Sequence, residues 1–428
     1  MRLMSLIFFA ATVLGLHAAD SEPRSLSLEQ AIQLSASVAP VDLARLDAAI
    51  AHAVAGSERA GLRPNIEAVG SWVRQRTYLQ TNNVPSSLTP DNTVDGRLRI
   101  GQALIDVETW NKTKAAERRL AAAEAGTALS LEDAAVNAGM TYAELAANEA
   151  LVSVRREDLT LAQELLSLAR KQVEAGASEG IAATRAENRV AAARTALTTA
   201  EGALRTSNIA LARSLRLDSA TTFIPSDKIG GEMACSSAPT VVLEAVTAAQ
   251  RARPELRVSD ENLAAIQADY QAARGARLPK IDAFADGGRS GPEFNDTENT
   301  WRVGVEVRIP LMDHRRYNAE AARYRMDQQR ILRTDLTQRV SAEVRFAIVA
   351  LETGIAGQES ALEERRLAER ELSEARSRFS AGAAGNLELV EAQRSLSTAR
   401  ERVVNALTIL TRARIGLARA VGVATTLR

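Results

Sequence analysis

Apolar residues recur every three or four positions through two long stretches of the chain, residues 104–176 and 311–382. This spacing places them along one face of an α-helix. No proline occurs between Pro90 and Pro225 or after Pro310, so proline interrupts neither stretch. At about 1.5 Å per residue, each helix would extend about 100 Å, far beyond a globular domain. Such helices need lateral packing, so their partners must come from the other half of the chain or from other copies.

The period changes from helical to twofold between residues 300 and 310. Polar or small residues alternate there with Trp301, Val303, Val305, Val307 and Ile309. One face of this strand would be apolar and the other largely charged. A strand of a membrane barrel, with lipid on one side and a wet lumen on the other, has this pattern. A half-buried strand of a soluble sheet has the same period, so the alternation alone leaves both possibilities open.

Two hairpins are predicted, each following a helix that ends at a proline. The helices cover residues 26–62, with a possible kink near Pro40, and residues 241–278. The first hairpin spans about 65–103, with turn formers at 81–92, and the second spans about 280–310, with a loop around Ser290-Gly291-Pro292. In the first hairpin, arginines at alternate positions could face water, while Trp72, Tyr78 and Trp301 could lie in an interfacial belt. These arginines are Arg74, Arg76, Arg97 and Arg99.

The chain is predicted to be a tandem duplication. A shift of 206 residues places Ala169-Arg170 on Ala375-Arg376, and the glycine break at Gly176 on the one at Gly382. The first repeat would cover residues 20–218 and the second 241–428, with an equatorial linker at 219–240. A further helix follows each glycine break, at about 181–217 and 387–421.

Residues 1–19 are predicted to be a signal peptide. Arg2 precedes an apolar run at residues 3–16, and small residues at Ala18 and Ala19 offer a cleavage site. A retained anchor helix is the alternative. Beyond this segment no run reaches the roughly 18 apolar residues of a spanning helix, so a mature chain that crosses a membrane must do so as strands.

Composition argues against an enzyme and against a nucleic-acid partner. The chain has 53 basic and 53 acidic residues and only 4% aromatic residues, which is typical of long helices. Cys235 is the single cysteine, and His52 and His314 are isolated, so neither a metal site nor a cofactor is expected. No catalytic grouping or phosphate-binding loop is present.

The chain has a signal peptide, a twofold repeat, a hairpin after each proline-ended helix, and glycine breaks. In this combination it resembles the TolC-like outer-membrane efflux protein family over almost the whole mature chain. The motifs that carry this resemblance are Leu28-Glu29-Gln30-Ala31, Arg308-Ile309-Pro310-Leu311-Met312-Asp313, Arg378-Phe379-Ser380-Ala381-Gly382 and Leu387-Glu388-Leu389-Val390-Glu391-Ala392-Gln393. The first repeat departs from the family pattern, because it lacks the proline of the strand-to-helix junction and the acidic residue after its tip.

The resemblance implies a mainly α fold with a transmembrane β-barrel. Four β-strands per protomer would complete a trimeric 12-stranded barrel, continued by a long α-helical periplasmic tunnel. Strand would pass into helix at Pro310 and Asp313, and at Asp106 in the first repeat. An open sheet edge is not tolerated in lipid and four strands cannot close a barrel, so physical reasoning also favours copies that share one barrel.

By the same resemblance, the glycine breaks are the periplasmic tips, where Gly176, Gly382 and Phe379 would contact an adaptor protein. Glu388 and Glu391 would ring the closed end of the tunnel as a gate; two surface glutamates are the alternative. The implied partners are two further copies of the chain, an adaptor, an inner-membrane pump and outer-membrane lipid.

The sequence therefore predicts an outer-membrane exit duct of a tripartite efflux system, passive and gated at its periplasmic end. Its helical part would lie in the periplasm. Two alternatives stay open: an exit duct for type I protein secretion, and a periplasmic coiled-coil structural or adaptor protein that never enters the membrane. Drugs, metal ions and proteins are all possible substrates.

Overall fold

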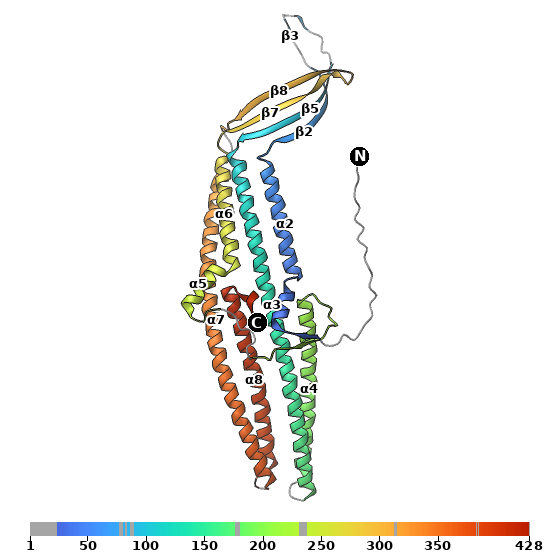
Figure 1. Cartoon of the computed structure of the whole chain (residues 1–428), viewed down its shortest axis with the longest axis vertical. Coiled ribbons are helices and arrows are strands. Elements are labelled where there is room, and N and C mark those ends of the chain that lie inside the picture. The colour runs from blue at the N-terminus through green and yellow to red at the C-terminus, as the bar shows by residue number, and fades with distance from the viewer. Residues whose placement is uncertain are drawn as a thin grey trace.

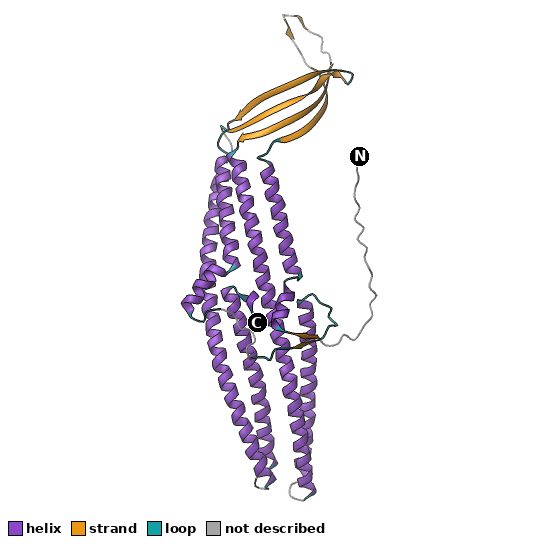
Figure 2. Cartoon of the chain, in the orientation of Figure 1, coloured by secondary structure: helices purple, strands orange, loops and turns teal. Residues whose placement is uncertain are grey.

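The computed structural model describes residues 24–76, 80–81, 84–85, 90–175, 180–230, 238–311, 315–381, 383 and 385–427. The molecule is long and narrow, with a curved sheet at one end and two helical hairpin tips at the other (Figure 1). Between them, short helices and strands form an equator around the middle of the bundle (Figure 2). Gly176, Gly382, Asp313, Tyr78 and Cys235 lie outside the described residues.

Helices make up most of the chain. They are α1 (Leu28–Ser35), α2 (Ala39–Ala60), α3 (Val107–Glu174), α4 (Gly180–Ser214), α5 (Val242–Ala252), α6 (Pro254–Gly275), α7 (Arg315–Ser380) and α8 (Asn386–Val421), followed by the short 3₁₀ helix η1 (Ala424–Thr426). The expected kink near Pro40 is a full break between α1 and α2, and a matching break separates α5 from α6 at Arg253. Pro40 and Pro254 stand in the first turn of α2 and α6, where a missing backbone N–H costs nothing.

Among the residues that the structure describes, the strands form three sheets. A two-stranded parallel sheet joins β1 (Arg24–Leu26) to β6 (Phe223–Pro225), and a short ribbon pairs β3 (Gln80–Thr81) with β4 (Val84–Pro85). The large sheet has the antiparallel order β2-β5-β7-β8 and consists of β2 (Asn65–Arg76), β5 (Pro90–Ile105), β7 (Lys280–Glu293) and β8 (Asp296–Arg308). The two predicted hairpins therefore lie side by side, joined along β5 and β7 with Ile100 opposite Ala285.

The loop predicted around residues 290–292 is wrong. These residues belong to β7, and the hairpin turns only after Glu293. The pairing of β7 with β8 shifts between Ser290 and Glu293, and such a bulge lets a strand carry Pro292, which cannot donate to the ladder. A side chain at Gly291 would collide with the backbone of Asp296, so glycine here permits a close approach of two strands rather than a turn.

Helix α3 is the axis of the packing. It runs from the sheet to the tip and contacts α2 and α6 in the upper half and α4 and α8 in the lower half (Figure 1). The equatorial core is built around Tyr142 of α3, Leu211 of α4 and Ile415 of α8. A second core lies near the tips, and a third joins α5, α7 and α8. Within the described part of the chain, none of the helices combines the length and apolar character needed to span a membrane.

Candidate functional site

The large sheet has one charged face. Because cross-strand partners share a face, the register places Arg97 and Arg99 of β5 on the same side as Asp286 of β7 and Arg302 of β8. Asp286 is buried between two arginines, with 3.2 Å from its Oδ1 to Nη1 of Arg97 and 2.9 Å from its Oδ2 to Nη2 of Arg302. Asp95 lies 2.6 Å from Nε of Arg97. Asp95, Arg97, Asp286 and Arg302 thus form a chain of ion pairs across three strands.

The opposite face of the sheet is apolar and uncovered in the single chain. Trp301 is 77% exposed and Val303 is 72% exposed, as the predicted alternation requires. Further exposed apolar residues on this face are Ile66, Trp72, Leu98, Ile100, Val305 and Val307. Arg74 lies on this face as well, opposite Asn92, so the arginines of the first hairpin do not share one face. A sheet exposed on both faces, one apolar and one charged, is suited to separating lipid from water.

Polar contacts of Asp106 stabilise the junction between strand β5 and helix α3. This residue is the N-cap of α3, where its carboxylate accepts a hydrogen bond from the backbone N–H of Thr109 at 3.0 Å. Nζ of Lys280, the first residue of β7, lies 3.1 Å from the same carboxylate. Burial alone would raise the pKa of Asp106, but the hydrogen bonds from Thr109 and Lys280 outweigh it and hold the pKa below its usual value. Pro310 follows β8 in an irregular segment between strand and helix.

At the second tip, Glu388 and Glu391 are exposed and lie one turn apart at the start of α8. Oε1 of Glu388 is 2.9 Å from Nη1 of Arg378 at the end of α7. Phe379 is only 2% exposed, because its ring packs into the core cluster near the tips. The Phe379 ring therefore consolidates the tip from inside and offers no surface to a partner. Its carbonyl accepts a hydrogen bond at 2.9 Å from Nε2 of Gln172 in α3.

An equatorial ion-pair network has no counterpart among the sequence predictions. Arg253, at the break between α5 and α6, is 4% exposed and contacts Glu255 at 2.7 Å and also Glu343 of α7. Glu255 in turn lies 2.6 Å from Arg419 of α8, which reaches Asp133 of α3 at 2.9 Å. Burial tends to raise the pKa of Glu255, but its bonds with Arg419 and Arg253 lower it below the usual value. Only the position of Arg253 before Pro254 could have marked this site.

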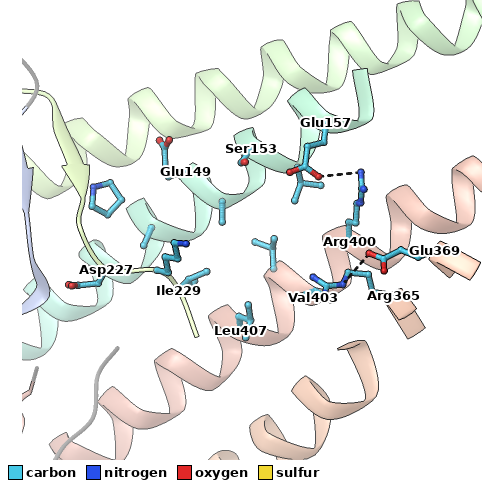
Figure 3. Close-up of a pocket in the computed structure, with 16 residues that line it drawn as sticks. Glu149, Ser153, Glu157, Asp227, Ile229, Arg365, Glu369, Arg400, Val403 and Leu407 are labelled. Atoms are coloured by element: carbon cyan, nitrogen blue, oxygen red, sulfur yellow. Dashed lines mark ion pairs between the residues drawn. The ribbon is translucent and has the colours of Figure 1, made fainter. Parts of the chain in front are cut away.

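A cavity of about 510 Å³ opens just on the tip side of the equator, where α3 and α8 stand apart (Figure 3). Its apolar wall includes Ile229, Val403 and Leu407. Its rim carries two ion pairs, Arg400 with Glu157 at 3.5 Å and Arg365 with Glu369 at 3.6 Å. In the described ranges, no three His, Cys, Asp or Glu side chains gather as a metal site would need.

Comparison with known proteins gives a consistent result. A family model described as outer membrane efflux protein matches residues 27–215 and again 245–423. The pyoverdine export outer membrane protein OpmQ of Pseudomonas aeruginosa is 26% identical in an alignment of 407 residues that covers 91% of this chain and 82% of that protein.

Solved structures that share the fold include those of CusC and VceC. The structure of CusC, which describes conformational changes that accompany folding and transmembrane channel formation, has a TM-score of 0.80 at 19% identity over 92% of both chains. The outer membrane protein VceC of Vibrio cholerae also has a TM-score of 0.80, at 17% identity, over 92% of this chain and 96% of that one.

These similarities confirm the expected fold class, in which a long helical tunnel protomer carries barrel-forming strands at one end. They also confirm the location in the outer membrane, with the helical part in the periplasm, and they exclude the periplasmic coiled-coil alternative. The chain belongs to the outer membrane efflux protein family.

Proposed function

We propose that the chain is one protomer of a homotrimeric exit duct that lets small molecules cross the outer membrane passively. The duct would be gated at its periplasmic end and loaded by an inner-membrane pump through a periplasmic adaptor. The observation that carries the proposal is the four-stranded sheet with one apolar and one charged face. Lipid would cover the apolar face, and the paired charges around Asp286 would line the water-filled interior.

The edges of the sheet support a barrel that several copies share. Strands β2 and β8 each have a neighbour on only one side within the described residues. Four strands are too few to close a barrel, and an edge exposed to lipid would leave backbone groups without partners. If β8 of one copy pairs with β2 of the next, three copies give twelve strands and no free edge.

The helices below these edges carry matching apolar stripes. Helix α2, which leads into β2, exposes Leu43, Leu46, Ile50 and Val54 at helical spacing. Helix α7, which follows β8, exposes Tyr317, Tyr324 and Ile331 at intervals of seven residues. Helices α2 and α7 lie at opposite sides of the upper bundle (Figure 1), so the pairing of copies that closes the barrel would also bring these two helices together, with their stripes buried as a coiled-coil seam.

The gate is proposed at Glu388 and Glu391. With two carboxylates per copy, a trimer would bring six to the tip of the tunnel, which favours cations and makes closure sensitive to charge. Adaptor docking is proposed at the hairpin ends near Gly176 and Gly382, where small residues let another helix approach. The name of the relative OpmQ refers to pyoverdine, and this favours a small organic cargo over a protein.

Reconstitution of the purified protein into planar bilayers tests the duct. We expect a trimer of the mature chain that resists dissociation in detergent until it is heated, and discrete conductance steps in the bilayer. A monomer without conductance would overturn the proposal. A deletion strain challenged with dyes, detergents and metal salts, and analysed for missing secreted proteins, would separate small-molecule efflux from protein secretion.

A further inference from the structure

The apolar face of the large sheet carries arginine at its outer end. On β2, Arg74 follows Trp72 on this face, toward the end of the strand that lies away from the helices. On β7, Arg289 lies opposite Asn299 of β8, which is two residues beyond Trp301 in the direction of the turn. Both arginine side chains are exposed. Because the helical part lies in the periplasm, this end of the sheet is the one that faces the outside (Figure 1).

The two faces of the sheet differ in the sign of their charges. The face around Asp286 carries charges of both signs, which form ion pairs with one another. On the apolar face, among the described side chains from Ile281 to Arg289 and along the stretches of β2, β5 and β8 that pair beside them, arginine is the only charged residue type. Within the part of the chain that the structure describes, Arg74 and Arg289 therefore have no acidic neighbour on their own face.

The side chain of Arg289 is directed outward along the sheet. Its Nη2 donates a hydrogen bond at 2.7 Å to the carbonyl oxygen of Thr297, which lies nearer the turn than Asn299 does. A long basic side chain at a membrane boundary extends in this way toward the polar layer, with its apolar stem over the apolar surface. A guanidinium has five N–H donors, so this bond leaves the others available to a ligand.

The apolar rows set the depth at which these arginines lie. Arg289 is eight positions beyond Ile281 on β7, which is about 26 Å along the strand and about 20 Å along the membrane normal at a tilt of about 40°. Arg289 aligns with Gly70 of β2 through Gly96 of β5, and Arg74 lies four positions farther out. The apolar band of a membrane barrel is about 25 Å tall and ends at aromatic girdles. Both arginines therefore reach the headgroup layer of the outer leaflet.

The strand order spaces the arginines evenly around the barrel. Arg74 on β2 and Arg289 on β7 are two strands apart, which is about 10 Å across the sheet. If β8 pairs with β2 of the next copy, the same two-strand interval separates Arg289 from the next arginine on β2. A barrel of twelve strands would then carry an arginine on every second strand around its outer rim.

We propose that Arg74 and Arg289 bind the phosphate groups of lipids in the outer leaflet and so fix the depth of the barrel in the membrane. A guanidinium matches phosphate with two parallel hydrogen bonds. The apolar rows that begin two residues inward would pack against the acyl chains of the same lipid. A phosphorylated lipid satisfies both features, whereas a soluble anion satisfies only the first. The inference depends on the place of the sheet in the outer membrane, and not on the gate or the cargo of the proposed function.

Native mass spectrometry of purified trimers, titrated with bisphosphorylated lipid A in a mild detergent, tests this site. Arg74→Gln combined with Arg289→Gln should weaken lipid A binding at least about tenfold, since charge-assisted hydrogen bonds to phosphate are lost. Arg99→Gln is the matched control, because Arg99 is an exposed arginine of the same sheet on the opposite face, and it should bind lipid A as the wild type does. Equal binding by the double variant and the wild type would overturn the proposal.

Two other ligands identify what the arginines recognise. Dephosphorylated lipid A should bind wild-type trimers as weakly as lipid A binds the double variant, and undiminished binding would refute recognition of phosphate. A large excess of inorganic phosphate should leave most of the lipid A bound, because it offers nothing to the apolar rows. Complete displacement by inorganic phosphate would show a general anion site and would contradict the assignment to a lipid.

A milder variant keeps the test decisive if the double glutamine variant does not assemble. Arg74→Lys with Arg289→Lys keeps both charges but loses the two-bonded geometry, so it should weaken lipid A binding by a smaller factor. Binding equal to that of the wild type would contradict recognition through the guanidinium groups. A wild type that forms no trimer would instead refute the proposed duct, whereas a conducting trimer that does not retain lipid A would refute only the lipid site.

Discussion

Val303 offers the sharpest test of which face of the sheet meets lipid. It lies near the middle of the apolar row on β8 and is 72% exposed in the single chain. An arginine on the lipid face of a membrane barrel costs about 2–4 kcal/mol near the bilayer midplane. Because each copy carries the substitution, a trimer with Val303→Arg should lose about 6–12 kcal/mol of its free energy of unfolding.

Glu306→Arg provides the matched control, three residues along the same strand on the charged face. It removes the 2.8 Å pair with Arg308, whose side chain is largely exposed, and such pairs contribute at most about 1 kcal/mol. Guanidinium titration of trimers in lipid vesicles, followed by their electrophoretic migration, measures both variants. The assignment of faces is refuted if Val303→Arg leaves the midpoint unchanged, or if Glu306→Arg lowers it as far.

Three further predictions follow from the tip and the equator. Replacing Glu388 and Glu391 with alanine should reduce the cation selectivity of the reconstituted pore, measured as a reversal potential under a salt gradient. An unchanged reversal potential would show that neither residue lines the axis of the pore. Tyr142→Phe should cost about 1–3 kcal/mol in denaturant titration, because the buried hydroxyl donates to the carbonyl of Leu26 at 2.9 Å and lies 3.0 Å from the carboxylate of Asp227. No loss would mean that water replaces the hydroxyl. Glu255, with its lowered pKa, should stabilise the protein at neutral pH and lose that effect as the pH falls below the usual glutamate range, about 4.3. Glu255→Gln should flatten this acid limb of stability, and an identical pH profile for both proteins would contradict the network.

The parts of the fold that depend on local periodicity could be predicted from the sequence. The structure confirms the strand from Trp301 to Val307 and the long helices, because each of these patterns depends only on residues a few positions apart. The loop at Ser290 to Pro292 was mispredicted, since glycine and proline usually mark turns but here mark a close approach of strands and a bulge.

Long-range contacts were beyond the reach of the sequence. In the sequence nothing distinguishes Arg253 and Asp158 from the other charged residues, of which 53 are basic and 53 are acidic. Only the fold shows that these two are buried. Phe379 stands in the tip motif, yet its ring turns inward, and no local pattern distinguishes an inward ring from one on the surface. The assignment of Glu388 and Glu391 to the gate stays a prediction that the selectivity measurement addresses, and the assignment of Gly176 and Gly382 to adaptor contact stays a prediction.

The pairing of β5 with β7 has a consequence for how the protein is made. Their partners are separated by 176 positions at Ile105 and Ile281 and by 197 positions at Val94 and Gly291. A lone hairpin is marginally stable in water. The first hairpin therefore becomes part of a stable sheet only after the second hairpin has been synthesised and pairs with it. During export, its uncovered Trp72 and Leu98 would stick to other chains. The apolar face of the early hairpin therefore stays without its neighbouring strand until the later hairpin has been delivered.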